Sequence, residues 1–144
     1  MELSSPPLAP ESEPPVRRRP RRPWRDKFRV AFRGFKFGVR GQSSFAVHFF
    51  FAVLVVVAAW TFGCSVAEWC MLLGCIGLVL TAEMFNSAIE TLFRGLNEET
   101  RARTWPSLDI SAAAVLLASL TAAVVGLLVF LPRLVERLRA LKVF

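Results

Sequence analysis

Three polar side chains interrupt the second of three long apolar runs in this 144-residue chain. Glu83, Asn86 and Glu90 are spaced i, i+3 and i+7, which places them on one face of a helix. A carboxylate deep in a bilayer costs about 2.5–3.5 kcal/mol by insertion scales, so two acids and a carboxamide in one row indicate a functional site. Packing through interhelical hydrogen bonds is an alternative for Asn86. A proton- or ion-conducting path is another, although the other two runs carry no complementary charge.

The chemistry that suits this row is transfer of a phosphoryl group from water-soluble ATP to the hydroxyl of a lipid. Loss of water around the Glu83 carboxylate makes it a better proton acceptor for such a hydroxyl. Glu90, two turns nearer the expected cytoplasmic end, is suited to bind Mg²⁺, which prefers oxygen ligands and usually takes one or two from protein. Asn86 lies between the two acids and can orient either. Phosphoryl transfer depends mainly on positioning and on charge neutralisation by metal ions and cations.

The elements that must position this row are membrane helices. Apolar runs extend over residues 45–62, 69–93 and 110–131. At 1.5 Å per residue each can cross roughly 30 Å of hydrocarbon, the first only just. Hydrophobic residues make up 54% of the chain, more than the roughly 45–50% typical of soluble domains. The sequence therefore predicts an all-α protein with three transmembrane helices in a membrane domain over 42–132, followed by a basic tail at 133–144.

The N-terminal part divides into a tail and an amphipathic segment. Residues 1–23 contain seven of the nine prolines and five arginines, and we expect this tail to be disordered because it can bury little apolar surface. In residues 24–41, apolar and mainly aromatic residues recur at spacings of three and four opposite a basic side. That pattern is typical of a helix lying in the membrane interface. A loosely folded basic arm is the alternative, because three glycines lower the helix propensity.

The charge distribution bears on partners and orientation. The net charge is +7, and 11 of the 18 basic residues lie between Arg17 and Arg40, directly before the first apolar run. This favours lipid headgroups over nucleic acid as the partner of the basic arm. The turn at 63–68 lacks Lys and Arg whereas the loop at 94–108 has three Arg, which places the N-terminus and that loop in the cytoplasm. The four cations of the C-terminal tail oppose this orientation but are outnumbered.

Two further titratable residues have more than one interpretation. Asp109 directly precedes the third apolar run, where it either complements the dipole of the helix or faces the same cytoplasmic mouth as Glu90. His48 lies about one turn into the first run, where it either satisfies an interhelical contact or takes part in catalysis.

The row and its surroundings resemble a known family. Residues 83–90 (EMFNSAIE), then Asp109 and residues 111–116 (SAAAVL), are similar to the bacterial integral-membrane diacylglycerol kinases, which include undecaprenol kinases. The resemblance covers about residues 28–131. It implies a homotrimer in the bacterial inner membrane, a multi-pass protein with a cytoplasmic N-terminus. It also implies phosphorylation of a membrane lipid alcohol, diacylglycerol or undecaprenol, with ATP and Mg²⁺.

The resemblance also implies roles for particular residues. Glu83 matches the catalytic base and Glu90 a metal ligand that contacts the nucleotide. Asn86, Asp109 and a loop acid, Glu99, match residues of the nucleotide site. Ser44 and His48, which we expect to face the lipid, belong to a segment more similar to the undecaprenol-kinase branch.

Three positions depart from the family pattern. Gln42 stands where the family has a second metal-binding glutamate, and Leu108 replaces a phosphate-binding lysine. Arg94 stands where the family has an acid, and we hypothesise that it, with Arg101 or Arg103, takes over the work of the missing lysine. The alternative is a homologue with the same fold that has lost catalysis and binds lipid or nucleotide without turnover.

Overall fold

The computed structural model describes residues 23–39 and 43–141. The expected disordered tail falls on residues that lie almost wholly outside these ranges, and Gln42 lies outside them too. The described part forms four helices and no strand: α1 (Trp24–Val39), α2 (Ser43–Thr61), α3 (Val66–Arg94) and α4 (Glu98–Leu141). The predicted all-α class is confirmed. Residues 24–39 form a helix, so the alternative of a loosely folded arm is wrong.

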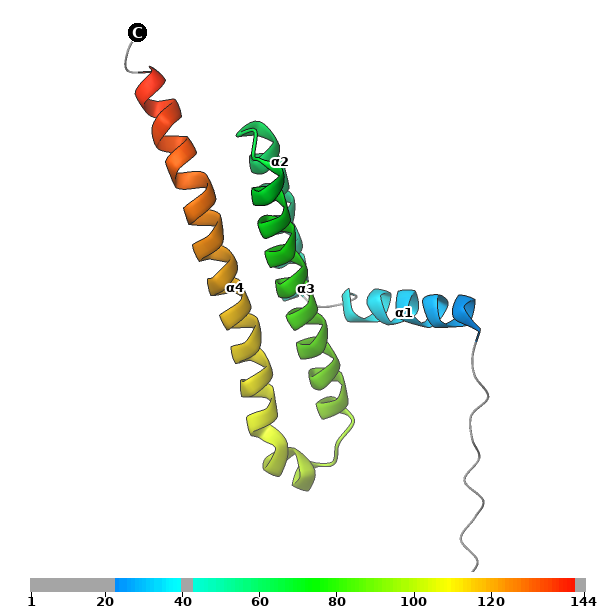
Figure 1. Cartoon of the computed structure of the whole chain (residues 1–144). Helices are drawn as coiled ribbons and strands as arrows, with labels where there is room; N and C mark the ends of the chain where they lie inside the picture. The colour runs from blue at the N-terminus through cyan, green and yellow to red at the C-terminus, as the bar shows by residue number, and fades with distance from the viewer. Residues whose placement is uncertain (1–22, 40–42, 142–144) are drawn as a thin grey trace, which may run out of the picture.

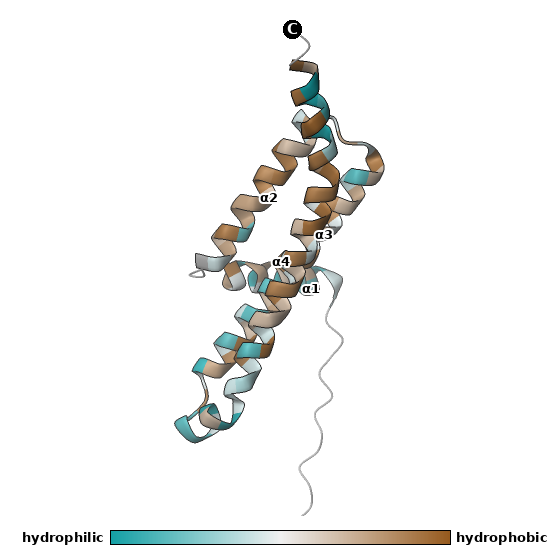
Figure 2. Cartoon of the chain, turned by 90° about the vertical axis from the view of Figure 1, so that its left-hand side faces the viewer, coloured by the Kyte–Doolittle hydropathy of each residue, from teal (hydrophilic) through white to brown (hydrophobic). Residues whose placement is uncertain are grey.

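The helices have two distinct orientations. Figure 1 shows α2, α3 and α4 running side by side, while α1 extends sideways from the bundle on the side of α3. The three aligned helices are long and apolar enough to cross a membrane, as the sequence predicts. Hydrophobic residues cover most of their length, and hydrophilic residues gather at the hairpin between α3 and α4 (Figure 2). The described helices thus form a bundle of three helices able to span a membrane, with α1 set at one side of it.

Local signals set the turn between α2 and α3. Gly63 has a φ of +64°, a left-handed conformation that glycine adopts without steric cost and that ends α2. Ser65 then caps α3, because its hydroxyl accepts from the Glu68 amide and the Glu68 carboxylate accepts from the Ser65 amide at 2.7 Å. This capping box satisfies backbone donors at the start of the helix.

The start of α4 differs from the sequence prediction. The expected loop at 94–108 shrinks to residues 95–97, and α4 begins at Glu98, where the Asn97 side chain accepts from the Thr100 amide at 2.9 Å. Pro106 lies inside the helix although proline removes one backbone hydrogen bond. Asp109 therefore sits about three turns into α4, and its interpretation as a residue that complements the helix dipole is wrong. At the other end, α4 continues through residues 133–141 of the predicted tail.

A hydrophobic cluster joins the three long helices at the end that holds the α2–α3 turn. Ala59, Leu72 and Val129 form a buried cluster there, one from each of the three long helices. Arg133 of α4 bridges the same end, donating from Nε to Glu68 Oε1 at 3.2 Å and from Nη1 to the Phe62 carbonyl at 3.1 Å. We call this the turn end and the opposite one, which holds the α3–α4 hairpin, the hairpin end.

Candidate functional site

Glu83 is the most deeply buried large side chain among the described residues, with 1% of its surface exposed. Its carboxylate faces α2, where the Ser44 hydroxyl donates to Oε1 and His48 Nε2 lies 3.9 Å from Oε2. Ser44 and His48 occupy positions i and i+4, so both reach α3 from one face of α2. A buried carboxylate requires such partners, because an unpaired charge away from water is costly. Both α2 residues, expected to face the lipid, therefore lie against the carboxylate, and Ser44 is hydrogen-bonded to it.

The rest of the row faces α4 and forms a chain of hydrogen bonds. Ser111 Oγ donates to Asn86 Oδ1 at 2.7 Å, and Asn86 Nδ2 donates to Glu90 Oε1 at 3.0 Å. Arg94 Nη2 lies 3.1 Å from the other Glu90 oxygen. The chain of contacts thus runs from a buried serine of α4 to an exposed arginine at the end of α3. It fixes the Glu90 carboxylate between an amide and a guanidinium.

A polar hollow of about 360 Å³ opens beside this chain. Its lining combines carboxylates, a guanidinium and aromatic rings from α3 and α4, and includes Asn86, Glu90, Arg94, Trp105, Leu108 and Asp109. The rings of Phe93 and Trp105, 5.6 Å apart, join the two helices at this point. The structure therefore places Asp109 and Glu90 in the lining of the same hollow. This is one of the two interpretations of Asp109 that the sequence left open.

The position of α1 relates the row to the membrane surface. Gly38 of α1 lies so close to α3 that a Cβ atom there would meet Met84 Sδ at 2.6 Å. Met84 follows Glu83 directly, so α1 meets α3 at the level of the buried carboxylate. Glu90 lies seven residues further along, about 10 Å toward the hairpin end. If α1 lies in the interface, Glu83 is at headgroup depth and Glu90 on the aqueous side.

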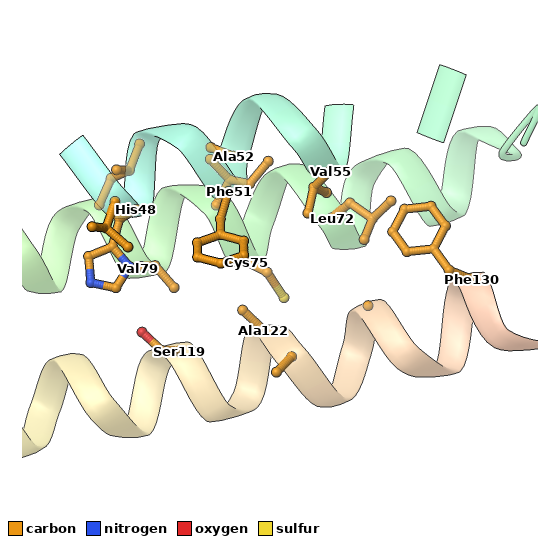
Figure 3. A pocket seen from close by; sticks show the side chains of 15 residues that line it. His48, Phe51, Ala52, Val55, Leu72, Cys75, Val79, Ser119, Ala122 and Phe130 are labelled. Carbon is orange, nitrogen blue, oxygen red and sulfur yellow. The ribbon is translucent and has the colours of Figure 1, made fainter. Parts of the chain in front are cut away.

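An apolar groove of about 380 Å³ runs between α2, α3 and α4 on the other side of Glu83. Figure 3 shows His48, Phe51 and Val55 of α2 facing Ser119 and Ala122 of α4 across it. His48 is thus shared, since its ring lines the groove while its Nε2 lies near the Glu83 carboxylate. Glu83 lines neither hollow; along α3 it lies between Leu80 of the apolar groove and Asn86 of the polar hollow.

The remaining candidate residues do not join this cluster. Glu99 pairs with Arg103 at 2.8 Å, both side chains are 78% exposed, and neither lines the polar hollow. Arg101 donates to the carbonyls of Phe93 and Arg94 at the end of α3. Arg101 and Arg103 therefore have structural partners, which leaves Arg94 as the guanidinium of the hollow. Among residues 23–39 and 43–141, no group of three His, Cys, Asp or Glu side chains is placed to hold a metal ion.

Sequence reasoning missed the role of Ser111. This serine directly precedes three alanines and lies 25 residues from Asn86, so no local pattern connects the two. Its hydroxyl is buried and lies 2.9 Å from the Leu108 carbonyl, a second acceptor for the same proton. The signal available in the sequence was the hydroxyl of Ser111, which has mainly apolar neighbours. Its distance from the α3–α4 hairpin lets it meet the Asn86 carboxamide on the facing helix.

Together these features define a small integral membrane protein with a carboxylate site built into its spanning helices. The chain belongs to the prokaryotic diacylglycerol kinase family, whose model matches residues 29–130. It is similar to the undecaprenol kinase of Bacillus subtilis (strain 168), with 28% identity over 104 residues that cover 72% of this chain and 85% of that protein. No solved structure gives a significant match.

Proposed function

We propose that this protein transfers the γ-phosphoryl group of ATP to the hydroxyl of a membrane lipid alcohol. The position of Glu83 carries this proposal, because this buried carboxylate lies along α3 between Leu80, which lines an apolar groove, and Asn86, which lines a polar hollow together with Glu90, Arg94 and Asp109. A kinase that moves a phosphoryl group from a nucleotide to a lipid needs an apolar site for the lipid and a polar site for the nucleotide, both near one proton acceptor. Membership of a lipid kinase family and the named relative support the same activity.

The reaction is a single displacement at the γ-phosphorus. The lipid oxygen forms a bond to phosphorus as the bond to the β,γ-bridging oxygen breaks, and ADP leaves with that bond's electron pair. The hydroxyl proton passes to Glu83, which general-base catalysis requires to lie within hydrogen-bond reach of the reacting oxygen. Ser44 holds one carboxylate oxygen by a hydrogen bond, and the His48 ring lies 3.9 Å from the other.

The polar hollow is the proposed nucleotide site. Glu90 and Asp109 both line it and offer the carboxylate oxygens that Mg²⁺ takes alongside substrate phosphates, with Gln42 as a further oxygen ligand. A bound Mg²⁺ would neutralise charge on the transferring phosphoryl group. Asn86 orients Glu90 through its 3.0 Å hydrogen bond. Glu99, on the surface of α4, would meet the nucleotide from outside the hollow.

Arg94 supplies the positive charge that is missing because position 108 is leucine rather than the family's lysine. Both residues line the same hollow, Leu108 from α4 and Arg94 from α3. A guanidinium binds phosphate oxygens through two parallel hydrogen bonds, where leucine offers none. The Glu90 contact at 3.1 Å orients the Arg94 side chain.

The proposed setting is the bacterial inner membrane, with the N-terminus and the α3–α4 hairpin in the cytoplasm, where ATP is available. The cations of α1 and of the hairpin support this orientation. The exposed aromatic rings of α1, such as Phe28 and Phe32, suit burial at the acyl boundary. A homotrimer is proposed from the family resemblance.

The decisive experiment is a phosphorylation assay in mixed micelles with labelled ATP and Mg²⁺, offering undecaprenol and diacylglycerol side by side. We expect wild-type turnover to be abolished by Glu83→Gln and retained in Glu136→Gln, an exposed acid near the opposite end of α4. Removal of Mg²⁺ with a chelator should stop the reaction. Absence of wild-type turnover on every lipid alcohol and at every Mg²⁺ concentration would instead favour the homologue that has lost catalysis.

A further inference from the structure

We propose that His48 relays a proton from the buried Glu83 carboxylate to water in each reaction cycle, so that Glu83 is ready to accept the next one. The inference rests on the proposed function, in which Glu83 takes the proton of a hydroxyl group. It deepens that function by adding a second titratable side chain, which acts through Glu83 and has no contact with the lipid in this role.

A buried carboxylate that has taken a proton needs a neighbour that removes it. Glu83 has 1% of its surface exposed and lines neither of the two hollows, so water does not reach it through either of them. Within residues 23–39 and 43–141, the polar contacts of its side chain are those with Ser44 and His48. Since every turnover adds one proton to Glu83, one of these two side chains has to carry it away.

The two carboxylate oxygens divide these neighbours between them. Oε1 accepts the hydrogen bond from the Ser44 hydroxyl, whereas Oε2 faces His48, whose Nε2 lies 3.9 Å away. The oxygen that is free to take a proton is therefore the one on the side of the imidazole. The separation is longer than the roughly 2.7–3.2 Å of a hydrogen bond, and a small rotation of either side chain or one bridging water closes it.

The imidazole is suited to receive this proton and release it. Histidine exchanges its proton in the physiological pH range, which a serine hydroxyl does not, and His48 is the single histidine of the chain. Its side chain is 21% exposed, against 2% for the side chain of Glu83. His48 thus connects a carboxylate that water does not reach with the outside of the bundle.

The proton balance of the cycle closes with this residue. The lipid hydroxyl gives its proton to Glu83 Oε2 as the lipid oxygen bonds to phosphorus and ADP leaves. That proton then moves to His48 Nε2, which leaves Glu83 as a carboxylate and the ring as an imidazolium. The imidazolium gives a proton to water and becomes neutral again. One proton is released for each lipid phosphorylated, and both side chains return to their starting forms.

The contacts of α1 indicate where water is available to the relay. Gly38 of α1 lies against Met84 of α3, and the ring of Phe35 packs on the buried ring of Phe45 in α2, with centroids 6.1 Å apart. Met84 follows the carboxylate directly, and Phe45 precedes the imidazole by three residues. An α1 that lies in the interface therefore places His48 near the depth of the lipid headgroups.

The surroundings of His48 offer little competition for the proton. Among the described residues that line the apolar groove with His48, Cys75 is the only other titratable one, and α4 contributes Ser119 besides apolar side chains. Figure 3 shows His48 at one end of this groove and Cys75 further along it. Glu83 is thus the one acidic group that faces the imidazole.

Chemical rescue tests the relay in the micelle assay, with the lipid alcohol that the wild type phosphorylates faster. We expect His48→Ala to lower kcat about tenfold or more while the KM values for ATP and lipid stay within about twofold. Added imidazole should restore about half of the lost kcat or more, because it can take the proton in place of the missing ring. An unchanged kcat in His48→Ala, or a lowered kcat that imidazole does not raise, would overturn the proposal.

Two further variants control the rescue. Glu83→Gln should gain nothing from imidazole, because the group that hands over the proton is absent. Phe49 is the next residue of α2, is exposed and does not line the groove, so Phe49→Ala should keep the wild-type kcat with or without imidazole. A similar gain from imidazole in all three variants would show an effect on the micelle and contradict the relay.

Rapid-quench measurements separate failure of the relay from failure of the kinase. His48→Gln keeps a polar side chain but cannot carry a proton, so it should form the first phosphorylated lipid per site at nearly the wild-type rate and then slow. Glu83→Gln should show no such burst. Wild-type turnover with identical, burst-free kinetics in His48→Gln would reject the relay and keep the kinase, whereas a wild type without turnover would reject the proposed function. A lost burst together with a lowered melting temperature would show that His48 stabilises the fold, and would also reject the relay.

Discussion

The two ends of α3 each carry acidic side chains, but their surroundings differ. At the turn end, Glu68 accepts hydrogen bonds from Ser65 and Arg133, and Arg133 also donates to backbone carbonyls of the turn. At the hairpin end, Glu83 is buried with a hydroxyl and an imidazole as its neighbours, and Glu90 lines a hollow. The first acid therefore joins helices, whereas at the hairpin end Glu83 is enclosed between helices and Glu90 faces a hollow that a ligand can occupy.

The surroundings of these acids show how a carboxylate that stabilises the fold differs from one placed for catalysis in a small membrane bundle. Glu68 meets a permanent guanidinium and a capping serine, which hold it as an anion bound to fixed partners. Glu83 instead has a serine hydroxyl and a histidine as its neighbours. Glu90 contacts Arg94 as Glu68 contacts Arg133, but it differs from Glu68 in lining a hollow.

The largest expected effect is that of Glu83→Gln. The amide keeps the size of the side chain but cannot accept the hydroxyl proton, so kcat for lipid phosphorylation should fall about 10²–10⁴-fold. Glu68→Gln is the matched change at the turn end and should leave kcat within about twofold of wild type while lowering the melting temperature. Initial rates with labelled ATP measure both. A comparable loss of kcat in Glu68→Gln would remove the distinction between the ends.

Arg94→Ala is expected to have the next largest effect. Removing a guanidinium that binds phosphate should raise the KM for ATP about tenfold or more, with a smaller change in the KM for lipid. Adding Leu108→Lys to this variant should restore a cation to the hollow and lower the KM again. An unchanged KM for ATP in Arg94→Ala would reject the proposed replacement of the lysine.

Ser111→Ala should produce a moderate loss of stability. The change removes the donor to the buried Asn86 oxygen, at a cost of about 1 kcal/mol. The melting temperature in detergent should fall, and kcat should fall with it because Asn86 orients Glu90. Ser107→Ala, at an exposed position one turn earlier in α4, provides the control. Identical melting curves for the two variants would show that the Asn86 contact contributes nothing.

Arg133→Gln is expected to have the smallest effect. Its ion pair and its bonds to the turn carbonyls lie at the surface of the bundle, where such contacts contribute little. The melting temperature should fall by less than in Ser111→Ala, and the Michaelis constants for ATP and lipid should not move. High salt should reduce the difference from wild type. A change in either Michaelis constant would mean that contacts at the turn end affect substrate binding at the hairpin end.

Most of the fold was accessible from sequence because its signals are local. Hydropathy located the three spans, and the Glu83, Asn86 and Glu90 spacing located the polar row. The start of α4 was missed because Pro106 normally ends or kinks a helix, yet here the Asn97 cap starts the helix before it. The partners of the row were missed because Ser44, His48 and Ser111 are distant in sequence, and only helix packing brings them to α3.

The 44-residue α4 has a mechanical consequence. At 1.5 Å per residue it measures about 66 Å, well beyond the roughly 40–45 Å of a whole bilayer with its headgroups. We therefore expect both ends of α4 to project into water whatever the lipid composition. Because α1 packs against α3 at Met84, bilayers of different thickness should differ in how far the ends of α4 project rather than in the level at which α1 meets α3.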